Sequence, residues 1–151
     1  MKLAIASDHG GFELKNYIME SLVKEKYDIE DFGCKSAESC DYPDYALKVA
    51  NAVAGGAANL GILVCGTGIG MSMAANKVKG IRAAVANSAE QAKLAREHNN
   101  ANILCIGGRV LENGQAEQIV KTFLTTNFSN EERHLQRINK IMEIEKHAEL
   151  Q

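Results

Sequence analysis

The chain alternates short apolar runs with longer segments in which apolar residues recur every three or four positions. A short apolar run is typical of a buried strand, and the longer period is typical of a helix that buries one face. The first such pair is an apolar run at 3–6 followed by a helical pattern over 12–22. The same pairing returns four times, as predicted strands at 27–32, 60–65, 81–86 and 102–106, followed by predicted helices at 43–54, 69–78, 88–98 and 115–125.

Five strands that alternate with helices predict one α/β domain over residues 1–151. We expect a three-layer, Rossmann-like α/β/α fold, in which a five-stranded parallel sheet has helices on both faces. Binding sites in such sheets lie at the carboxyl ends of strands, so the loops after the first, third and fifth strands are the places to look. A further helix over about 129–148 has a narrow apolar stripe, which favours packing against a partner subunit.

Composition narrows the classes of function. The 17 basic and 19 acidic residues are nearly balanced, so no broad positive surface is expected for nucleic acid or an anionic membrane. The first ten residues turn polar too soon for a signal peptide, and no apolar run approaches membrane-spanning length. We therefore expect a cytoplasmic protein with no membrane partner.

The four cysteines, Cys34, Cys40, Cys65 and Cys105, form no CxxC pair and have no matching histidine spacing, so no metal is expected. Cys65 differs from the others because a glycine-rich turn follows it at the end of an apolar strand. Backbone N–H groups of such a turn favour a phosphate or a developing oxyanion, and a thiolate beside them would be a base or nucleophile with a lowered pKa. The other three are predicted to be small buried residues or surface thiols.

Polar residues also stand at the first strand's carboxyl end. Asp8 and His9 open a turn that contains two glycines, and a parallel sheet could bring this turn beside Cys65. The simpler interpretation is that Ser7 or Asp8 caps the following helix.

Three arginines and a histidine complete the candidate site residues that residue chemistry suggests. Arg109 follows a Gly-Gly turn after the fifth strand, where a guanidinium could hold a phosphate. Arg133 and Arg137 share a helix face and either grip one anion or form a solvated patch with nearby glutamates. His98 is either a site residue or a partner of the helix dipole. The GTGIG turn lacks dinucleotide-binding spacing, so a nucleotide cofactor is disfavoured.

Taken together, six ordered segments closely resemble the type B ribose-5-phosphate isomerases over nearly the whole chain. They are SDHGG at 7–11, DYPDYA at 41–46, CGTGIGMSMAANK at 65–77, GIRAA at 80–84, HNNANILCIGGR at 98–109 and RHLQR at 133–137. The family also contains galactose-6-phosphate and allose-6-phosphate isomerases. The resemblance implies a metal-free, cofactor-free interconversion of ribose 5-phosphate and ribulose 5-phosphate through a cis-enediolate.

The resemblance also implies roles for particular residues. Asp8 and His98 would open the sugar ring, and Cys65 would move the proton between C2 and C1. Thr67 would help proton transfer between the two oxygens, and backbone N–H groups of Gly66, Thr67, Gly68, Ile69 and Gly70 would hold the enediolate. The phosphate would be bound by His9, Arg109, Arg133 and Arg137, and the sugar by Tyr42 and Asn99.

Family enzymes are dimers whose active sites use both subunits, so the resemblance implies a homodimer, with pairing into a tetramer left open. The helix over about 129–148 would lie at the dimer interface. Met71 stands where another branch of the family carries a glutamate base, which places this chain with the cysteine-base branch. Two alternatives remain open: an isomerase of a hexose 6-phosphate, and a non-catalytic module that binds a phosphosugar.

Overall fold

A computed structural model describes residues 1–148. The strands are β1 (Lys2–Ser7), β2 (Asp28–Asp31), β3 (Leu60–Cys65), β4 (Ala83–Val85) and β5 (Ile103–Gly107). The helices are a short 3-10 turn η1 (His9–Gly11), α1 (Phe12–Lys24), α2 (Tyr42–Ala54), α3 (Ile69–Ala75), α4 (Ala89–Glu97), α5 (Asn113–Thr125) and α6 (Glu132–Ala148).

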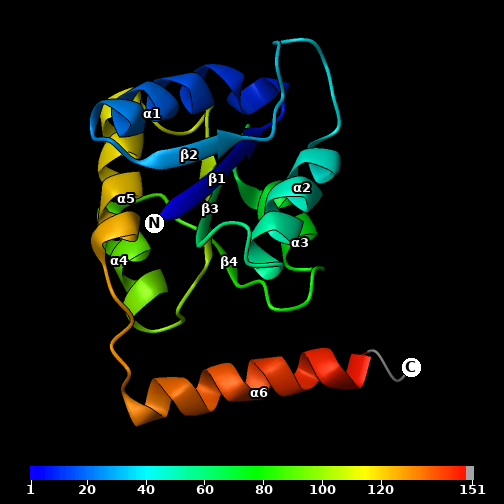
Figure 1. The fold of residues 1–151 in the computed structure, drawn as a ribbon, viewed down its shortest axis with the longest axis vertical. Coiled ribbons are helices and arrows are strands. Elements are labelled where there is room, and N and C mark those ends of the chain that lie inside the picture. The colour runs from blue at the N-terminus through cyan, green and yellow to red at the C-terminus, as the bar shows by residue number, and fades with distance from the viewer. Residues whose placement is uncertain (149–151) are drawn as a thin grey trace.

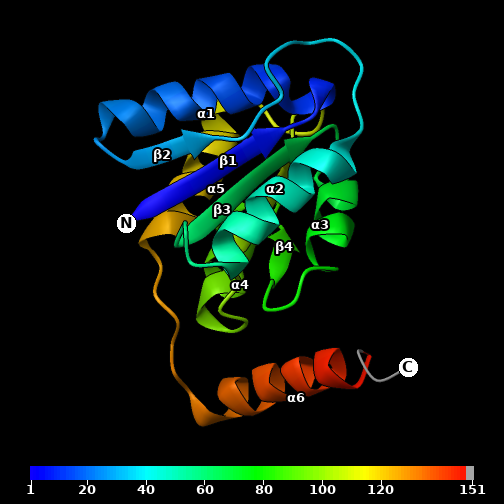
Figure 2. The same cartoon turned by 45° about the vertical axis from the view of Figure 1, so that its right-hand side comes forward.

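The strands form one parallel sheet in the order β2-β1-β3-β5-β4. Helices α1, α4 and α5 cover one face of the sheet, and α2 and α3 cover the other (Figures 1 and 2). The predicted three-layer fold is therefore confirmed. The order sets β1, β3 and β5 side by side, so the loops that follow these three strands meet at one edge.

The core divides into two layers because side chains of a strand alternate between the faces of the sheet. Leu3 and Ile5 point toward α1 and α5, whereas Ala4 and Ala6 point toward α2. Phe123 of α5 is fully buried in the first layer. Small residues on the second face, Ala4 and Ala6, let α2 lie close to the sheet. Its first turn lies at the carboxyl ends of the strands because the chain enters α2 from the loop after β2.

Several predicted ends shift by a few residues. The predicted helix 69–78 ends at Ala75, and the predicted strand 81–86 shortens to Ala83–Val85. The Asn76 side chain explains the first change, because its amide pairs with both the N–H and the C=O of Ala83, at 2.8 and 2.9 Å. The chain therefore turns toward β4 instead of continuing the helix.

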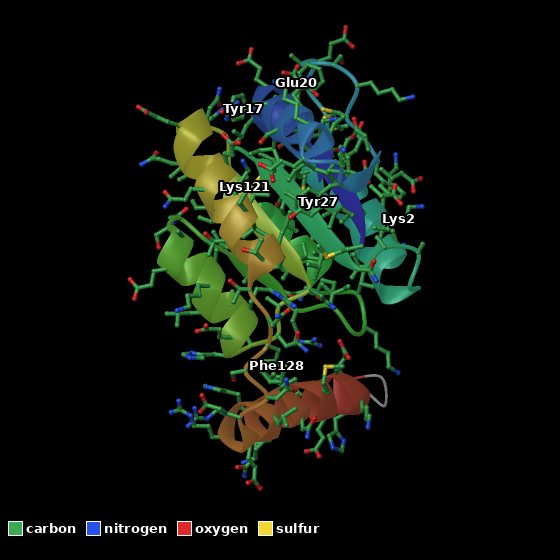
Figure 3. The ribbon with its side chains drawn as sticks, turned by 60° about the vertical axis from the view of Figure 1, so that its left-hand side comes forward. Lys2, Tyr17, Glu20, Tyr27, Lys121 and Phe128 are labelled. Carbon is green, nitrogen blue, oxygen red and sulfur yellow. The ribbon has the colours of Figure 1, made fainter. Side chains whose placement is uncertain are left out.

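Helix α6 lies apart from the sheet, across one end of the molecule (Figures 1 and 2). Figure 3 shows α5 leading through Phe128 into this helix. Contacts with the body include a hydrogen bond from the Gly80 N–H to Glu145 at 3.0 Å. Leu135, Ile141 and Ile144 of α6 are exposed apolar side chains. Within residues 1–148, no helix has both the length and the apolar character needed to cross a membrane.

Candidate active site

The loops after β1, β3 and β5 are joined by backbone hydrogen bonds at the carboxyl edge of the sheet. The Asp8 N–H donates to the Val64 carbonyl at 3.2 Å, which ties the first loop to β3. The Gly108 N–H donates to the Cys65 carbonyl at 2.7 Å, and the Arg109 N–H donates to the Gly66 carbonyl at 3.0 Å. The predicted approach of the Asp8 turn to the Cys65 loop is therefore confirmed, and the Arg109 loop joins them.

Glycines are needed where these loops touch. A Cβ at Gly11 would lie 2.4 Å from the Val64 carbonyl oxygen, and one at Gly108 would lie 2.7 Å from the Gly10 carbonyl oxygen. Both contacts are with backbone atoms, which cannot move aside as a side-chain tip can. The glycines thus allow three main chains to converge, which larger residues would hold apart.

Cys65 ends β3 as a buried residue, with 4% of its surface exposed. The Gly68 N–H donates a hydrogen bond to its Sγ at 3.1 Å. Gly68 adopts a left-handed conformation, with φ of +80°, which turns its amide back toward the sulfur. An amide donor stabilises negative charge on sulfur, so this contact suits a cysteine that works as a thiolate.

Some backbone N–H groups of the glycine-rich turn already donate hydrogen bonds within the chain. The Ile69 N–H donates to Thr67 Oγ1 at 3.2 Å, so this amide and that of Gly68 already have acceptors. Thr67 itself is exposed, beside the buried Cys65. A Cβ at Gly70 would lie 2.6 Å from the Tyr42 ring, so the predicted sugar-binding tyrosine stands directly over the start of α3.

Asp8 and His9 have different surroundings in the same turn. Asp8 is buried and its Oδ1 accepts the Gly11 N–H at 3.1 Å, so the capping interpretation is confirmed for this residue. His9 is half-buried, and its Nδ1 accepts the N–H of Cys40 at 3.2 Å. A neutral imidazole whose Nδ1 accepts carries its proton on Nε2, which leaves that nitrogen as a donor.

Arg109 supplies a positive charge at this edge. Its guanidinium lies over Gly66, where an added Cβ would be 3.4 Å from Nη1. The residue is exposed, so the cation faces solvent beside the Cys65 loop. The first group of predicted residues, which consists of Asp8, His9, Tyr42, Cys65 with residues 66–70, and Arg109, is therefore brought together.

The second group lies near the amino ends of the strands, at the other end of the sheet from Cys65. It consists of His98, Asn99, Arg133 and Arg137. His98 caps the carboxyl end of α4, and the chain then enters β5 from its amino end. Arg133 and Arg137 belong to α6, which lies away from the tips of β1 and β3 (Figure 2). One chain therefore does not bring this group to Cys65.

Arg133 is exposed, and its Nε bonds Glu131 at 2.8 Å. The Asn99 carbonyl accepts from Arg82 Nε at 3.1 Å. In a single chain, Arg133 and the Asn99 carbonyl are therefore engaged by other residues of the same chain.

His134 is a residue of this second group that the sequence analysis missed. Its ring stacks on that of His98, with centroids 4.2 Å apart and planes inclined by 16°. The side chain is buried, and no described group makes a hydrogen bond with its Nε2, although the Glu131 carboxylate lies 3.9 Å from that atom. Burial, followed by the charges of His98 and Arg133, lowers the pKa of His134. Its place within RHLQR, between the two arginines, was the signal in the sequence.

A cavity of about 730 Å³ lies between α6 and the β4 side of the sheet, and its lining includes Asn99, Ile141 and Ile144. It is separate from the Cys65 loop, although it touches the second group. Among residues 1–148, no cluster of three or more histidine, cysteine, aspartate or glutamate side chains has the arrangement of a metal site.

Comparison with known proteins gives a consistent result. The family model described as Ribose/Galactose Isomerase matches residues 3–141. Ribose-5-phosphate isomerase B of Escherichia coli is 46% identical over 144 residues, which cover 95% of this chain and 96% of that protein.

Solved structures match over almost the full length. Ribose-5-phosphate isomerase B of Clostridium thermocellum has a TM-score of 0.96 at 51% identity, covering 98% of this chain and 99% of that one. The enzyme of Mycoplasma genitalium, solved with bound ribulose-5-phosphate, has a TM-score of 0.92 at 45% identity and covers 96% of each chain.

Proposed function

Because the chain belongs to the ribose/galactose isomerase family, we propose that it interconverts D-ribose 5-phosphate and D-ribulose 5-phosphate. The observation that carries the proposal is the buried Cys65 thiol, which receives an amide hydrogen bond where three loops converge. It is supported by the bound ribulose-5-phosphate in the related Mycoplasma genitalium structure.

The proposed reaction begins with opening of the furanose ring, in which Asp8 and His98 exchange protons with the ring oxygen and the C1 hydroxyl. Cys65, as thiolate, then removes the proton from C2 and returns it to C1. Negative charge develops on the substrate oxygen as the C–H bond breaks, so a donor must lie beside it. Within residues 66–70, the N–H groups of Gly68 and Ile69 already donate inside the turn, so those of Gly66, Thr67 and Gly70 would supply such donors. The Thr67 hydroxyl assists proton transfer between O1 and O2.

The phosphate is assigned to cations and donors at the rim of the site. His9 offers its Nε2–H, since its Nδ1 is occupied by the Cys40 amide. Arg109 adds a guanidinium beside Gly66. Arg133 and Arg137 would complete the phosphate site, and Tyr42 and Asn99 would contact the sugar. No metal or cofactor has a part in this mechanism.

The wide separation of the two groups of residues supports a homodimer as the working unit. A two-fold axis can set the His98 end of one chain against the Cys65 edge of the other. The exposed apolar residues of α6 suit an interface element, because a surface of this kind is stabilised by burial. Each site in the proposed dimer would then use Cys65 from one chain and His98 and both arginines from the other.

Incubation with ribose 5-phosphate in heavy water tests the proposal. Proton transfer by a cysteine that exchanges with solvent should place deuterium on the carbon beside the carbonyl, detected by nuclear magnetic resonance. Cys65→Ala should lower turnover by roughly 10²- to 10⁴-fold. Cys105→Ala, which removes a fully buried thiol of β5, is the matched control and should retain most of the rate.

Two rival functions make different predictions in the same assay. A hexose-6-phosphate isomerase would turn over allose or galactose 6-phosphate faster than ribose 5-phosphate, and that result would overturn the substrate assignment. A non-catalytic binding module would give neither product nor deuterium exchange. Near-normal turnover of Cys65→Ala would show that another group is the base.

A further inference from the structure

The turn that leads from α4 into β5 is held by the side chain of Arg82, a half-buried residue that directly precedes β4. Arg82 Nε donates to the carbonyls of Asn99 and Asn100, at 3.1 and 3.2 Å, and its Nη2 donates to the Asn100 carbonyl at 2.9 Å. These carbonyls belong to the two residues that follow His98. One planar guanidinium therefore binds the main chain immediately after His98.

Arg82 is itself fixed from two sides. The Asn102 side chain accepts the Arg82 N–H at 2.8 Å and donates to the Gly80 carbonyl at 2.9 Å, and the Asn102 N–H donates to the Arg82 carbonyl at 3.0 Å. On the other side, Arg82 Nη1 lies 3.7 Å from Met142 Sδ of α6. The guanidinium thus has a defined place between the turn and α6.

The turn has a backbone conformation that needs such support. Asn100 has a φ of +44°, in the left-handed region that residues other than glycine seldom adopt. Arg96 holds the far side of the turn, because its Nη1 bonds Asn100 Oδ1 at 3.1 Å and also the Ala101 carbonyl. Carbonyls at the end of a helix lack donors from the helix itself and favour a nearby cation. Loss of Arg82 would remove charge-assisted donors from both carbonyls that it binds.

We propose that Arg82 is a positioning residue of the active site, which holds the main chain of His98 and Asn99 in the place where both side chains reach the sugar. This role rests on the proposed function, in which His98 helps to open the sugar ring. The stack of His134 on His98 supports the imidazole ring, whereas Arg82 fixes the backbone that carries it. A displacement of about 1 Å in a group that transfers a proton can cost roughly 10²-fold in rate.

The two sugar phosphates differ in their need for His98, and this difference separates positioning from general support of the fold. Ribose 5-phosphate is a closed furanose that must be opened. Ribulose 5-phosphate is an open chain, because its C5 oxygen carries the phosphate and no remaining hydroxyl can form a five- or six-membered ring with the C2 carbonyl. Exchange of its C1 proton with solvent through Cys65 therefore needs no ring opening.

Arg82→Met removes the guanidinium and keeps an unbranched side chain. Turnover of ribose 5-phosphate should fall roughly 10- to 100-fold. Exchange at C1 of ribulose 5-phosphate in heavy water, followed by nuclear magnetic resonance, should stay within about threefold of the wild-type rate. His98→Asn should show the same split between the two substrates. Arg82→Lys, which retains a charged donor, should keep more of the ribose 5-phosphate turnover than Arg82→Met.

Glu117→Gln is the control for a loss of stability far from the turn. Glu117 pairs with Lys121 at 2.7 Å and accepts from Tyr17 at 2.9 Å, where α5 meets α1. This variant should leave both rates unchanged. Equal losses with the two substrates in Arg82→Met, or full turnover of ribose 5-phosphate, would overturn the positioning role.

Hydrogen exchange of the backbone amides tests the same role without substrate. The Asn100 and Ala101 N–H groups bond carbonyls of α4 at 3.1 and 2.9 Å, and they should exchange about tenfold faster in Arg82→Met than in the wild-type protein. Unchanged protection of these amides would overturn the proposal. If the wild-type protein gives neither turnover nor exchange at C1, the proposed function fails, and amide exchange alone decides whether Arg82 positions the turn.

Discussion

Lys15 shows how one buried charge organises the chain that follows β2. It is 1% exposed, and its ammonium contacts Asp31 at 2.8 and 2.9 Å and the Cys34 carbonyl at 2.7 Å. Asp31 also accepts the Gly33 N–H at 2.9 Å, so the same carboxylate fixes the chain that leaves β2. Removing water from an ammonium is costly unless donors and acceptors match, and here three acceptor atoms surround it.

The two sides of this ion pair should respond unequally to substitution. Asp31→Asn leaves a buried ammonium without a counter-charge and should lower the free energy of unfolding by about 3 kcal/mol. Lys15→Met should cost less, about 1–2 kcal/mol, because the Asp31 side chain is 32% exposed and stays hydrated. Urea unfolding of both variants measures the difference. A larger loss for Lys15→Met would show that packing or the Cys34 carbonyl bond dominates.

Among the elements, the contact of η1 with β3 determines how closely the β1 and β3 loops approach. Gly11→Ala should lower stability by about 1–3 kcal/mol, because the added methyl meets the Val64 carbonyl at 2.4 Å. Gly114→Ala in α5 is the matched control, since nothing lies within 4 Å of its added Cβ, and it should be neutral or slightly stabilising. Thermal unfolding of both variants decides; equal melting temperatures would contradict the close-contact argument.

The contact between His134 of α6 and His98 at the end of α4 should weaken in acid. The pKa of the buried His134 is lowered from its ordinary value of 6.5, chiefly by burial. His134 is therefore protonated at a higher pH in the unfolded chain than in the folded one. The stability that depends on neutral His134 is present above about pH 6.5 and is lost as the pH falls below it.

His134→Phe keeps a ring against His98 and removes the titration. We expect a smaller fall in melting temperature between about pH 7.5 and pH 5.5 for this variant than for the wild-type protein. Parallel falls in the two proteins would assign the acid sensitivity to other groups.

For the molecule as a whole, the decisive feature is that Cys65 lies at the carboxyl ends of the strands and His98 at their amino ends. If dimers share their sites, two inactive variants should complement each other. Cys65→Ala mixed with His98→Asn should recover about a quarter of the wild-type sites after subunit exchange, because half of the dimers are mixed and each mixed dimer holds one intact site. Turnover of ribose 5-phosphate is the measurement, and each variant alone is the control.

Absence of recovery, with subunit exchange verified by mass spectrometry of differently tagged chains, would show that each chain builds its own site. The cavity between α6 and β4, which touches Asn99, would then become the place to examine for a site within one chain.

The sequence was sufficient to predict the helices and strands and to predict that the residues around Cys65 lie together. Apolar period and strand length are local properties, so the β–α units and their order could be predicted within a few residues. The ends that moved depend on side chains that reach across space, as Asn76 does to Ala83. The cluster of Asp8 and Cys65 was predictable because parallel strands bring their carboxyl ends together.

The sequence by itself determined the α/β fold, the position of Cys65 beside a glycine-rich turn, and the family resemblance, since each depends on residue type and spacing. Only the tertiary structure decided the stacking of His134 on His98 and the separation of His98 from Cys65. These relations join positions whose distance along the chain carries no signal, because the sheet order and the path of α6 alone bring them together or keep them apart.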